Sequence, residues 1–266
     1  MGAMQCALAV LKAATTNDKH NAVCDLADRW QLRRDIGTPI SSPPDTPGRP
    51  ESPNLVPPAE VPRRRLGSKN GRAALLHAVA HIEFNAIDLA ADMIVRFGHH
   101  SYIPDELRSD FIGDWISVCH DEARHFMMIE TRLENLQSSY GAFPAHNGLW
   151  EAAVATKHNF AARLAIAPMV LEARGLDVTP AIIEKLKKNE DLESAEILKT
   201  IYNDEIGHVA IGAKWFRIFA ELKHKNPESY FHELVGTYYA GKLKPPFNVQ
   251  ARTLAGLKQG FYMPLI

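Results

Sequence analysis

Apolar residues recur at intervals of three and four along most of the chain, the spacing that places them on one face of an α-helix. This pattern predicts four long helices, over about residues 71–97, 104–136, 147–174 and 191–224. One or two helices over 5–35 precede them and stop near Gly37, a short helix capped by Thr179 lies between the third and the fourth, and a last helix covers about 228–239. Little of the chain alternates as strands do, so the predicted fold class is all-α.

Between Gly37 and Gly67 the pattern changes, because nine prolines in 31 residues exclude both helix and interior strand. We expect an extended arm, and Leu55, Val56 and Val61 favour an arm laid over the folded domain rather than a free linker. The predicted organisation therefore has an N-terminal helical segment, a Pro-rich arm, a helical bundle and a C-terminal tail, over 1–36, 37–68, 69–240 and 241–266.

Six side chains that bind metal ions well interrupt the apolar faces of the four long helices: Glu83, Glu122, His125, Glu172, Glu205 and His208. A buried carboxylate is costly unless it is protonated, paired or bound to a metal ion. Taken alone, a buried glutamate is usually a member of an ion pair, and a buried histidine is usually a hydrogen-bonded core residue. Taken together, their order of Glu, Glu-x-x-His, Glu, Glu-x-x-His is that of the four-helix proteins with a two-metal carboxylate centre.

The two Glu-x-x-His pairs belong to a repeated motif, Asp-Glu-x-x-His, at Asp121–His125 and Asp204–His208. Residues three apart on a helix share a face, so each motif presents a carboxylate and an imidazole to the same point. A third Glu-x-x-His, from Glu221 to His224, lies off the apolar face at a helix end, and we assign it to the solvated surface.

The third helix raises a geometric difficulty, because a straight helix from residue 147 would carry Glu172 far from the level of the other ligands. We therefore predict that 147–158 turns aside and that 159–175 forms the bundle helix, broken or kinked near Pro168. If Glu172 lay away from the site, Glu151 would be the alternative. His77, His81 and Tyr202 are assigned to the core or to the border of the site, whereas Cys119 lies off the metal-facing stripe and is given no role.

Composition narrows the function classes. The net charge of −1 gives no global field for nucleic acid or an anionic membrane, and the local cluster Arg63-Arg64-Arg65 is predicted to be a solvated turn. Three cysteines form neither a disulfide framework nor a metal clip, which favours a reducing, cytoplasmic setting. No apolar run approaches the roughly 18 residues of a membrane helix, so no membrane partner is expected.

The chain resembles, along nearly its whole length, the ferritin-like family grouped as "domain of unknown function 455". Six segments carry the resemblance: Val61–Ser68, His77–Glu83, Asp121–Phe126, Tyr140–His146, Leu171–Pro180 and Asp204–Ala210. The resemblance implies a ferritin-like four-helix bundle, with extra terminal helices here, and a dinuclear iron site. More distantly the chain is similar to di-iron hydroxylases, including the ferritin-like tRNA hydroxylases.

This similarity implies roles for particular residues. Glu83 and Glu205 would each bind one metal ion, and Glu122 and Glu172 would bridge the two. Asp121 and Asp204 would orient the histidine of the opposite motif, as outer carboxylates do at metal sites generally. Arg124 would pair with Asp204, whereas Gly207 occupies the matching place in the second motif.

Four carboxylates and two imidazoles suit iron best, with manganese or a mixed pair as alternatives, and their charge balances two divalent ions. The leading hypothesis is an O2-dependent oxidoreductase, an oxygenase or hydroxylase, that takes electrons from an external donor and acts on a small molecule or a modified nucleoside. Two alternatives stay open: a ferroxidase or iron-storage protein, and a binding protein that keeps its metal for stability.

Overall fold

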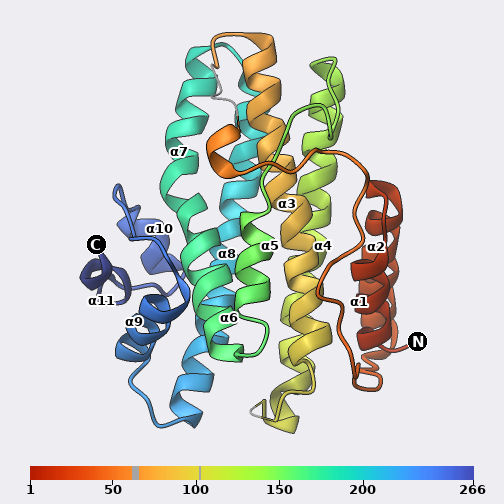
Figure 1. Cartoon of the computed structure of the whole chain (residues 1–266), viewed down its shortest axis with the longest axis vertical. Helices are drawn as coiled ribbons and strands as arrows, with labels where there is room; N and C mark the ends of the chain where they lie inside the picture. Colours follow the sequence, from red (N-terminus) through yellow and green to blue (C-terminus); the bar gives the residue numbers. More distant parts are fainter. Residues whose placement is uncertain (62–65, 102) are drawn as a thin grey trace. The chain divides into compact units, whose positions relative to one another are not determined.

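The computed structural model describes residues 1–61, 66–101 and 103–266, so the cluster Arg63–Arg65 lies outside the described residues. The described chain is all-α, as predicted, and its extended segments form one isolated bridge but no β-strand. It divides into two compact units, Met1–Trp150 and Glu151–Ile266, whose helices are labelled in Figure 1. None of the described helices is both long enough and apolar enough to cross a membrane.

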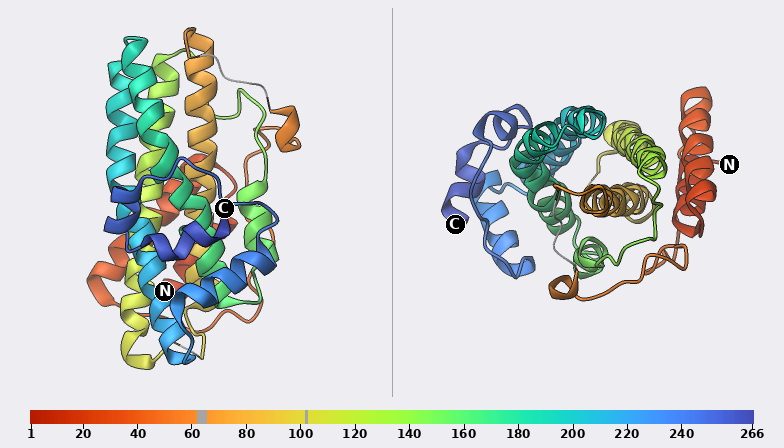
Figure 2. Two further views of the ribbon diagram at one scale, coloured as in Figure 1. Left: turned by 90° about the vertical axis from the view of Figure 1, so that its left-hand side faces the viewer. Right: turned by 90° about the horizontal axis from the view of Figure 1, so that it is seen from above.

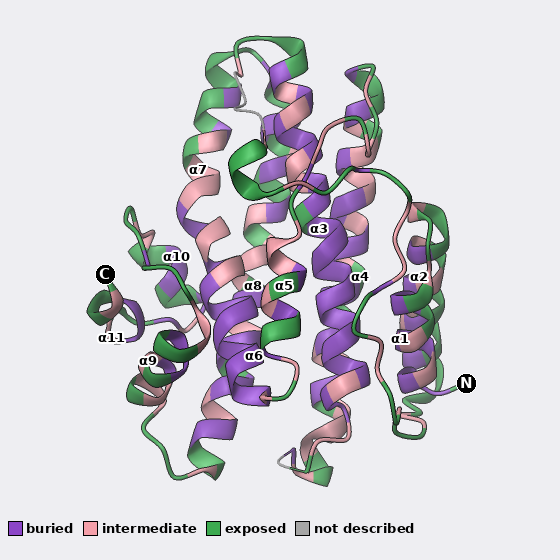
Figure 3. Ribbon diagram, viewed as in Figure 1, coloured by how far each residue is buried: buried purple, intermediate pink, exposed green. Residues whose placement is uncertain are grey.

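The first unit is built on a helical hairpin of α3 (Lys69–Phe97) and α4 (Asp105–Asn135), which run side by side (Figure 2). Ser68 caps the start of α3 by accepting a hydrogen bond from the backbone N–H of Gly71 at 3.1 Å. Two shorter helices cover the hairpin: α1 (Ala3–Lys12) packs against α3 and α2 (Thr16–Arg33) against α4. As a result α3 is buried along most of its length, as Figure 3 shows.

The Pro-rich arm is laid over the first unit, as predicted. Gly48 donates to the carbonyl of Leu11 in α1 at 2.6 Å, and Val56 donates to the carbonyl of Ala145 at 2.8 Å. Its only helical turn among the described residues is η1 (Pro58–Glu60). The expected apolar contacts were partly wrong, because Leu55 is 42% exposed, whereas Pro47 and Pro53 are buried. Prolines suit an arm of this kind, because an extended segment with few N–H groups can pack on an apolar surface at little desolvation cost.

The second unit is built on a second hairpin. Its first arm is a continuous helical rod of α6 (Phe160–Ile166), the π-helix η2 (Ala167–Glu172) and α7 (Ala173–Lys188). Its second arm is α8 (Leu192–Leu222), against which all three parts of the rod pack. The predicted turn before this rod is confirmed: α5 (Gly148–Ala155) ends early, and the Asn159 side chain caps a new helix by accepting from Ala162 N at 3.0 Å.

The separate helix predicted to start at Thr179 was wrong, because α7 runs through this point with Pro180 inside it. A proline there cannot donate to the carbonyl of Leu176, four residues earlier. The Asn248 side chain donates to that carbonyl instead, at 3.3 Å. A partner distant in sequence therefore supplies the hydrogen bond that the helix itself lacks.

The C-terminal part contains more helix than the predicted tail. After α9 (Pro227–Tyr238) come α10 (Val249–Leu254), α11 (Gln259–Tyr262) and the single turn η3 (Met263–Leu265). Arg252 of α10 binds Asp177 of α7 through both carboxylate oxygens, at 2.8 and 2.7 Å, and both side chains are buried. This paired, bidentate contact fixes α10 on the rod.

We expect Gly212→Ala to destabilise the protein by about 1–3 kcal/mol, because a Cβ at Gly212 of α8 would lie 2.4 Å from two ring carbons of Pro168 in η2. The matched control is Gly175→Ala in α7, where an added Cβ meets nothing within 4 Å. That substitution should stabilise the helix by about 0.5–1 kcal/mol. Urea denaturation of both variants measures the difference, and equal effects would contradict close packing of α8 on η2.

Candidate metal centre

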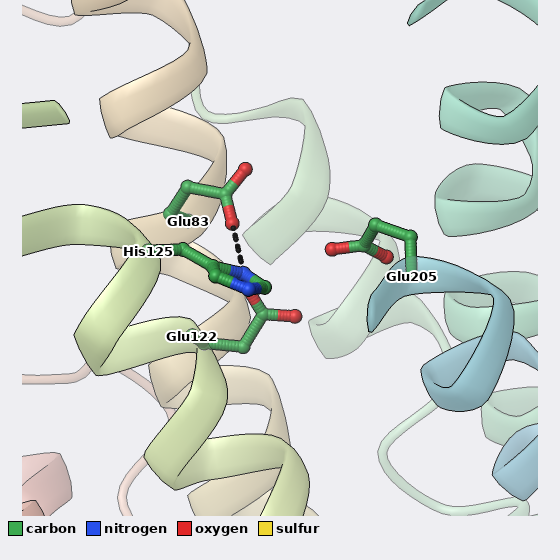
Figure 4. A group of neighbouring side chains, drawn as sticks. All are labelled: Glu83, Glu122, His125 and Glu205. Carbon is green, nitrogen blue, oxygen red and sulfur yellow. Dashed lines mark hydrogen bonds and ion pairs between the residues drawn. The ribbon is translucent and has the colours of Figure 1, made fainter. Parts of the chain in front are cut away.

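Three of the predicted ligands meet in the core of the first unit. Glu83 of α3 and Glu122 and His125 of α4 are 3%, 1% and 0% exposed. The Nδ1 atom of His125 lies 3.2 Å from Oε2 of Glu83 and 3.5 Å from Oε2 of Glu122. One ligand atom from each side chain lies within 4.8 Å of the others, and Figure 4 shows the three directed toward one another. Glu122 and His125 share a face because they are three residues apart in α4.

The electrostatics of this cluster require a positive charge, since two carboxylates converge where almost no water reaches them. Burial by itself lowers the pKa of His125, but the adjacent Glu122 and Glu83 outweigh it and raise the pKa to about 11. In the absence of a metal ion, the proton on His125 therefore supplies the compensating charge. A bound divalent cation would take over that role and would displace the proton.

The second unit carries the other three predicted ligands on its own hairpin. Glu205 and His208 lie one turn apart on α8, with His208 Nδ1 3.5 Å from Oε1 of Glu205. Their side chains are 14% and 3% exposed. Figure 4 labels Glu205 on its helix. Glu172 is the last residue of η2 on the opposite arm.

The hairpin geometry removes the difficulty over Glu172. This residue lies sixteen residues before the end of α7 at Lys188, and His208 lies sixteen residues after the start of α8 at Leu192. At about 1.5 Å per residue both are about 24 Å from the turn. Glu172 and His208 are therefore level with one another on paired helices, as the prediction for Glu172 requires, and the choice of Glu172 over Glu151 stays a prediction.

Asp121 and Arg124, which belong to the first motif but are not predicted ligands, are less buried than Glu122 and His125. Asp121 and Arg124 form an ion pair within the first motif at 3.1 Å, with side chains 32% and 40% exposed. The pairing of Arg124 with Asp204 stays a prediction, as do the orienting roles of Asp121 and Asp204. The third Glu-x-x-His is confirmed as surface: Glu221 and His224 are exposed, and α8 already ends at Leu222.

Apart from His77 and His81, which were expected in the core or beside the site, sequence reasoning did not foresee a second row of buried polar side chains on α3. Its members are His77, His81, Asn85, Asp88 and Asp92, all at most 6% exposed. Their spacing of three and four residues was the available signal, but only their partners show what they do. His77 accepts from the N–H of Gly141 at 2.9 Å, and Asp88 pairs with the buried Lys19 of α2 at 2.5 Å.

His81 gives this row a measurable pH dependence. Burial, followed by the charge of Arg49, lowers its pKa from 6.5 to about 4, so the folded protein binds a proton less readily than the unfolded chain. The stability due to His81 is therefore fully present above pH 6.5 and is lost as the pH falls toward 4.

We expect that loss to be on the order of 2–3 kcal/mol in the free energy of unfolding. The variant His81→Gln should show a flatter dependence between pH 6.5 and 4 than the unmodified protein. The exposed His224 provides the control His224→Gln, which should retain the full dependence. Urea denaturation across this pH range makes the measurement. An unchanged slope in His81→Gln would contradict the assignment.

The fold and the site thus define an all-α protein with a buried acidic and histidine cluster able to hold a metal ion. The chain belongs to the family described as "Protein of unknown function (DUF455)", whose model matches residues 12–263. A relative from Haemophilus influenzae, titled "Uncharacterized protein", is 41% identical over 256 residues, which cover 94% of this chain and 88% of the relative. No solved structure matches the chain.

Proposed function

We propose that the protein is a di-iron carboxylate protein that acts as an O2-dependent oxidoreductase. The observation that carries the proposal is the convergence of Glu83, Glu122 and His125 in a buried cluster. Carboxylate oxygens and imidazole nitrogens form a hard, mixed donor set that suits iron or manganese and lacks the thiolates that softer metals prefer. The nearest cysteine in sequence, Cys119, donates to the carbonyl of Ile87 at 3.6 Å.

The two hairpins supply equivalent sets of ligands, which supports a site of two ions. In each, the first arm contributes one glutamate, Glu83 or Glu172, and the second arm contributes a Glu-x-x-His pair. We propose that the hairpins associate as the four helices of a ferritin-like bundle. Glu83, Glu122, Glu172 and Glu205 would then hold the two ions together with His125 and His208. The four carboxylates would balance the charge of two divalent ions.

Two ferrous ions held in this way would supply electrons to dioxygen, and an external electron donor would return the iron to the ferrous state. The protein's own groups have three tasks. The carboxylates and the neutral imidazoles of His125 and His208 hold the ions, so His125 must give up the proton that it carries in the metal-free cluster. The apolar side chains around the cluster exclude water. The substrate would be a small molecule or a modified nucleoside.

Anaerobic titration with ferrous iron, followed by exposure to O2, tests the proposal. We expect binding to saturate at about two ions per chain and O2 uptake to continue only while a reductant is supplied. Accumulation of many ions per chain would instead indicate iron storage. Saturable binding without O2 uptake would indicate a metal kept for stability, and the absence of both iron and manganese binding would refute the metal centre.

A further inference from the structure

The first unit contains a cavity that the proposed metal centre does not use. It has a volume of about 300 Å³ and lies between the Pro-rich arm, residues 49–55, and the side chains of His81, Phe84 and Tyr140. This volume is at the lower end of the range for small-molecule sites. The cavity therefore has room for a ligand of roughly ten non-hydrogen atoms rather than for a macromolecular segment.

Arg49 gives the cavity its charge. Its two terminal nitrogens donate to neutral amide oxygens, to Asn147 Oδ1 at 2.7 Å and to Asn85 Oδ1 at 2.6 Å. Its third donor, Nε, is buried and has no hydrogen-bond partner among the described residues. The two amides fix the orientation of the guanidinium without cancelling its charge. A buried guanidinium without a counter-charge is costly, and an anion placed in the cavity beside it would balance that charge.

The other polar groups of the cavity make a single negative charge the best match. Tyr140 and His81 form a hydrogen bond at 2.9 Å, and burial raises the pKa of Tyr140, so its hydroxyl is neutral at pH 7. Glu51 also lines the cavity, but it is exposed, so solvent screens its repulsion of a single negative charge while it still disfavours a dianion such as phosphate. The nearby Asp88 is already paired with Lys19. One guanidinium therefore faces the ligand, and a monocarboxylate balances it.

The apolar residues that line the cavity determine which kind of uncharged group the ligand can carry. The ring of Phe84 and the side chains of Pro53 and Leu55 line the cavity, and Phe84 is held by Phe126 and Tyr140 at ring distances of 5.4 and 5.5 Å. Fixed aromatic and proline surfaces favour a flat apolar group, because little freedom is lost when they bind one.

We propose that this cavity is a binding site for a small monocarboxylate with a flat apolar body, its carboxylate paired with the guanidinium of Arg49. The site is formed by the first unit alone and does not depend on the metal centre.

The test uses 4-fluorobenzoate and its neutral analogue 4-fluorobenzamide as probes, followed by fluorine NMR on metal-free and iron-loaded protein. We expect the benzoate to bind saturably in both forms, and at least about tenfold more tightly than the benzamide, because the amide lacks the charge that Arg49 requires. Inorganic phosphate should compete poorly. Equal binding of the two probes, no binding of the benzoate, or stronger binding of phosphate would each overturn the proposal.

Two variants locate the binding. Leu55→Trp should fill the cavity and weaken benzoate binding at least about tenfold without unfolding the protein, because Leu55 is 42% exposed. The control is Leu32→Trp, at a position that is 81% exposed on α2 and outside the cavity, and it should change nothing. Arg49→Lys should weaken binding of the benzoate but not of the benzamide. If that variant fails to fold, Leu55→Trp decides, and unchanged binding by Leu55→Trp refutes the site.

Discussion

Glu122→Gln protein, expressed in iron-rich medium and purified anaerobically, is expected to retain less than about one-tenth of the iron of the unmodified protein. Glu122 is 1% exposed and its Oε2 lies 3.5 Å from Nδ1 of His125, so it stands at the centre of the acidic cluster. Glutamine keeps the volume of the side chain but removes the charge, and in the proposed centre it would remove one of the carboxylates that hold the ions. Elemental analysis for iron and manganese makes the measurement.

The chain offers a matched control in its third Glu-x-x-His. Glu221 has the same spacing to a histidine but is exposed at the end of α8, so Glu221→Gln should leave the metal content unchanged. Glu122→Gln protein that keeps its full metal content would exclude a centre built on Glu122. Loss of metal from both variants would show that surface carboxylates, rather than the buried cluster, hold the ions.

Removal of either member of the buried Lys19–Asp88 pair should lower the free energy of unfolding by about 3–5 kcal/mol. Both side chains are 0% exposed, and Lys19 also donates to the carbonyl of Val10 at 3.2 Å. In Asp88→Leu the ammonium group would remain in the core of the first unit without its carboxylate. The double variant Lys19→Met/Asp88→Leu removes both charges together and should recover most of the loss.

The pH dependence separates the two single variants. Burial raises the pKa of Asp88 to about 6 even though Lys19 opposes the change. Without Lys19, the carboxyl takes up a proton more readily still, so Lys19→Met should be less destabilised at pH 5 than at pH 8. In Asp88→Leu no carboxyl group remains to take up a proton, so its destabilisation should not become smaller at pH 5. Urea denaturation at both pH values tests this, and single losses below about 1 kcal/mol would show that the pair contributes little.

Local pattern was sufficient for three of the four hairpin arms, α3, α4 and α8, and for the burial of three predicted ligands. The predicted ranges 71–97, 104–136 and 191–224 differ from α3, α4 and α8 by at most two residues at each end. Long amphipathic helices are recognisable because the same spacing of apolar residues recurs in every turn. The same periodicity placed Glu83, Glu122 and His125 on buried faces, where the structure has them, and assigned Glu221 to the surface, where it lies. The metal itself stays a prediction.

Contacts between residues far apart in the sequence determined the features that the local pattern did not predict. Pro180 stays inside α7 because Asn248, 68 positions later, donates to the carbonyl that the proline leaves free. Arg49 faces a cavity because Asn85 and Asn147 hold it there. No periodicity encodes such partners, because each is a single contact whose free energy depends on where the whole chain places both groups. The sequence alone thus determined an all-α chain with Glu83, Glu122 and His125 on buried faces, and only the tertiary structure decided which distant polar groups satisfy one another.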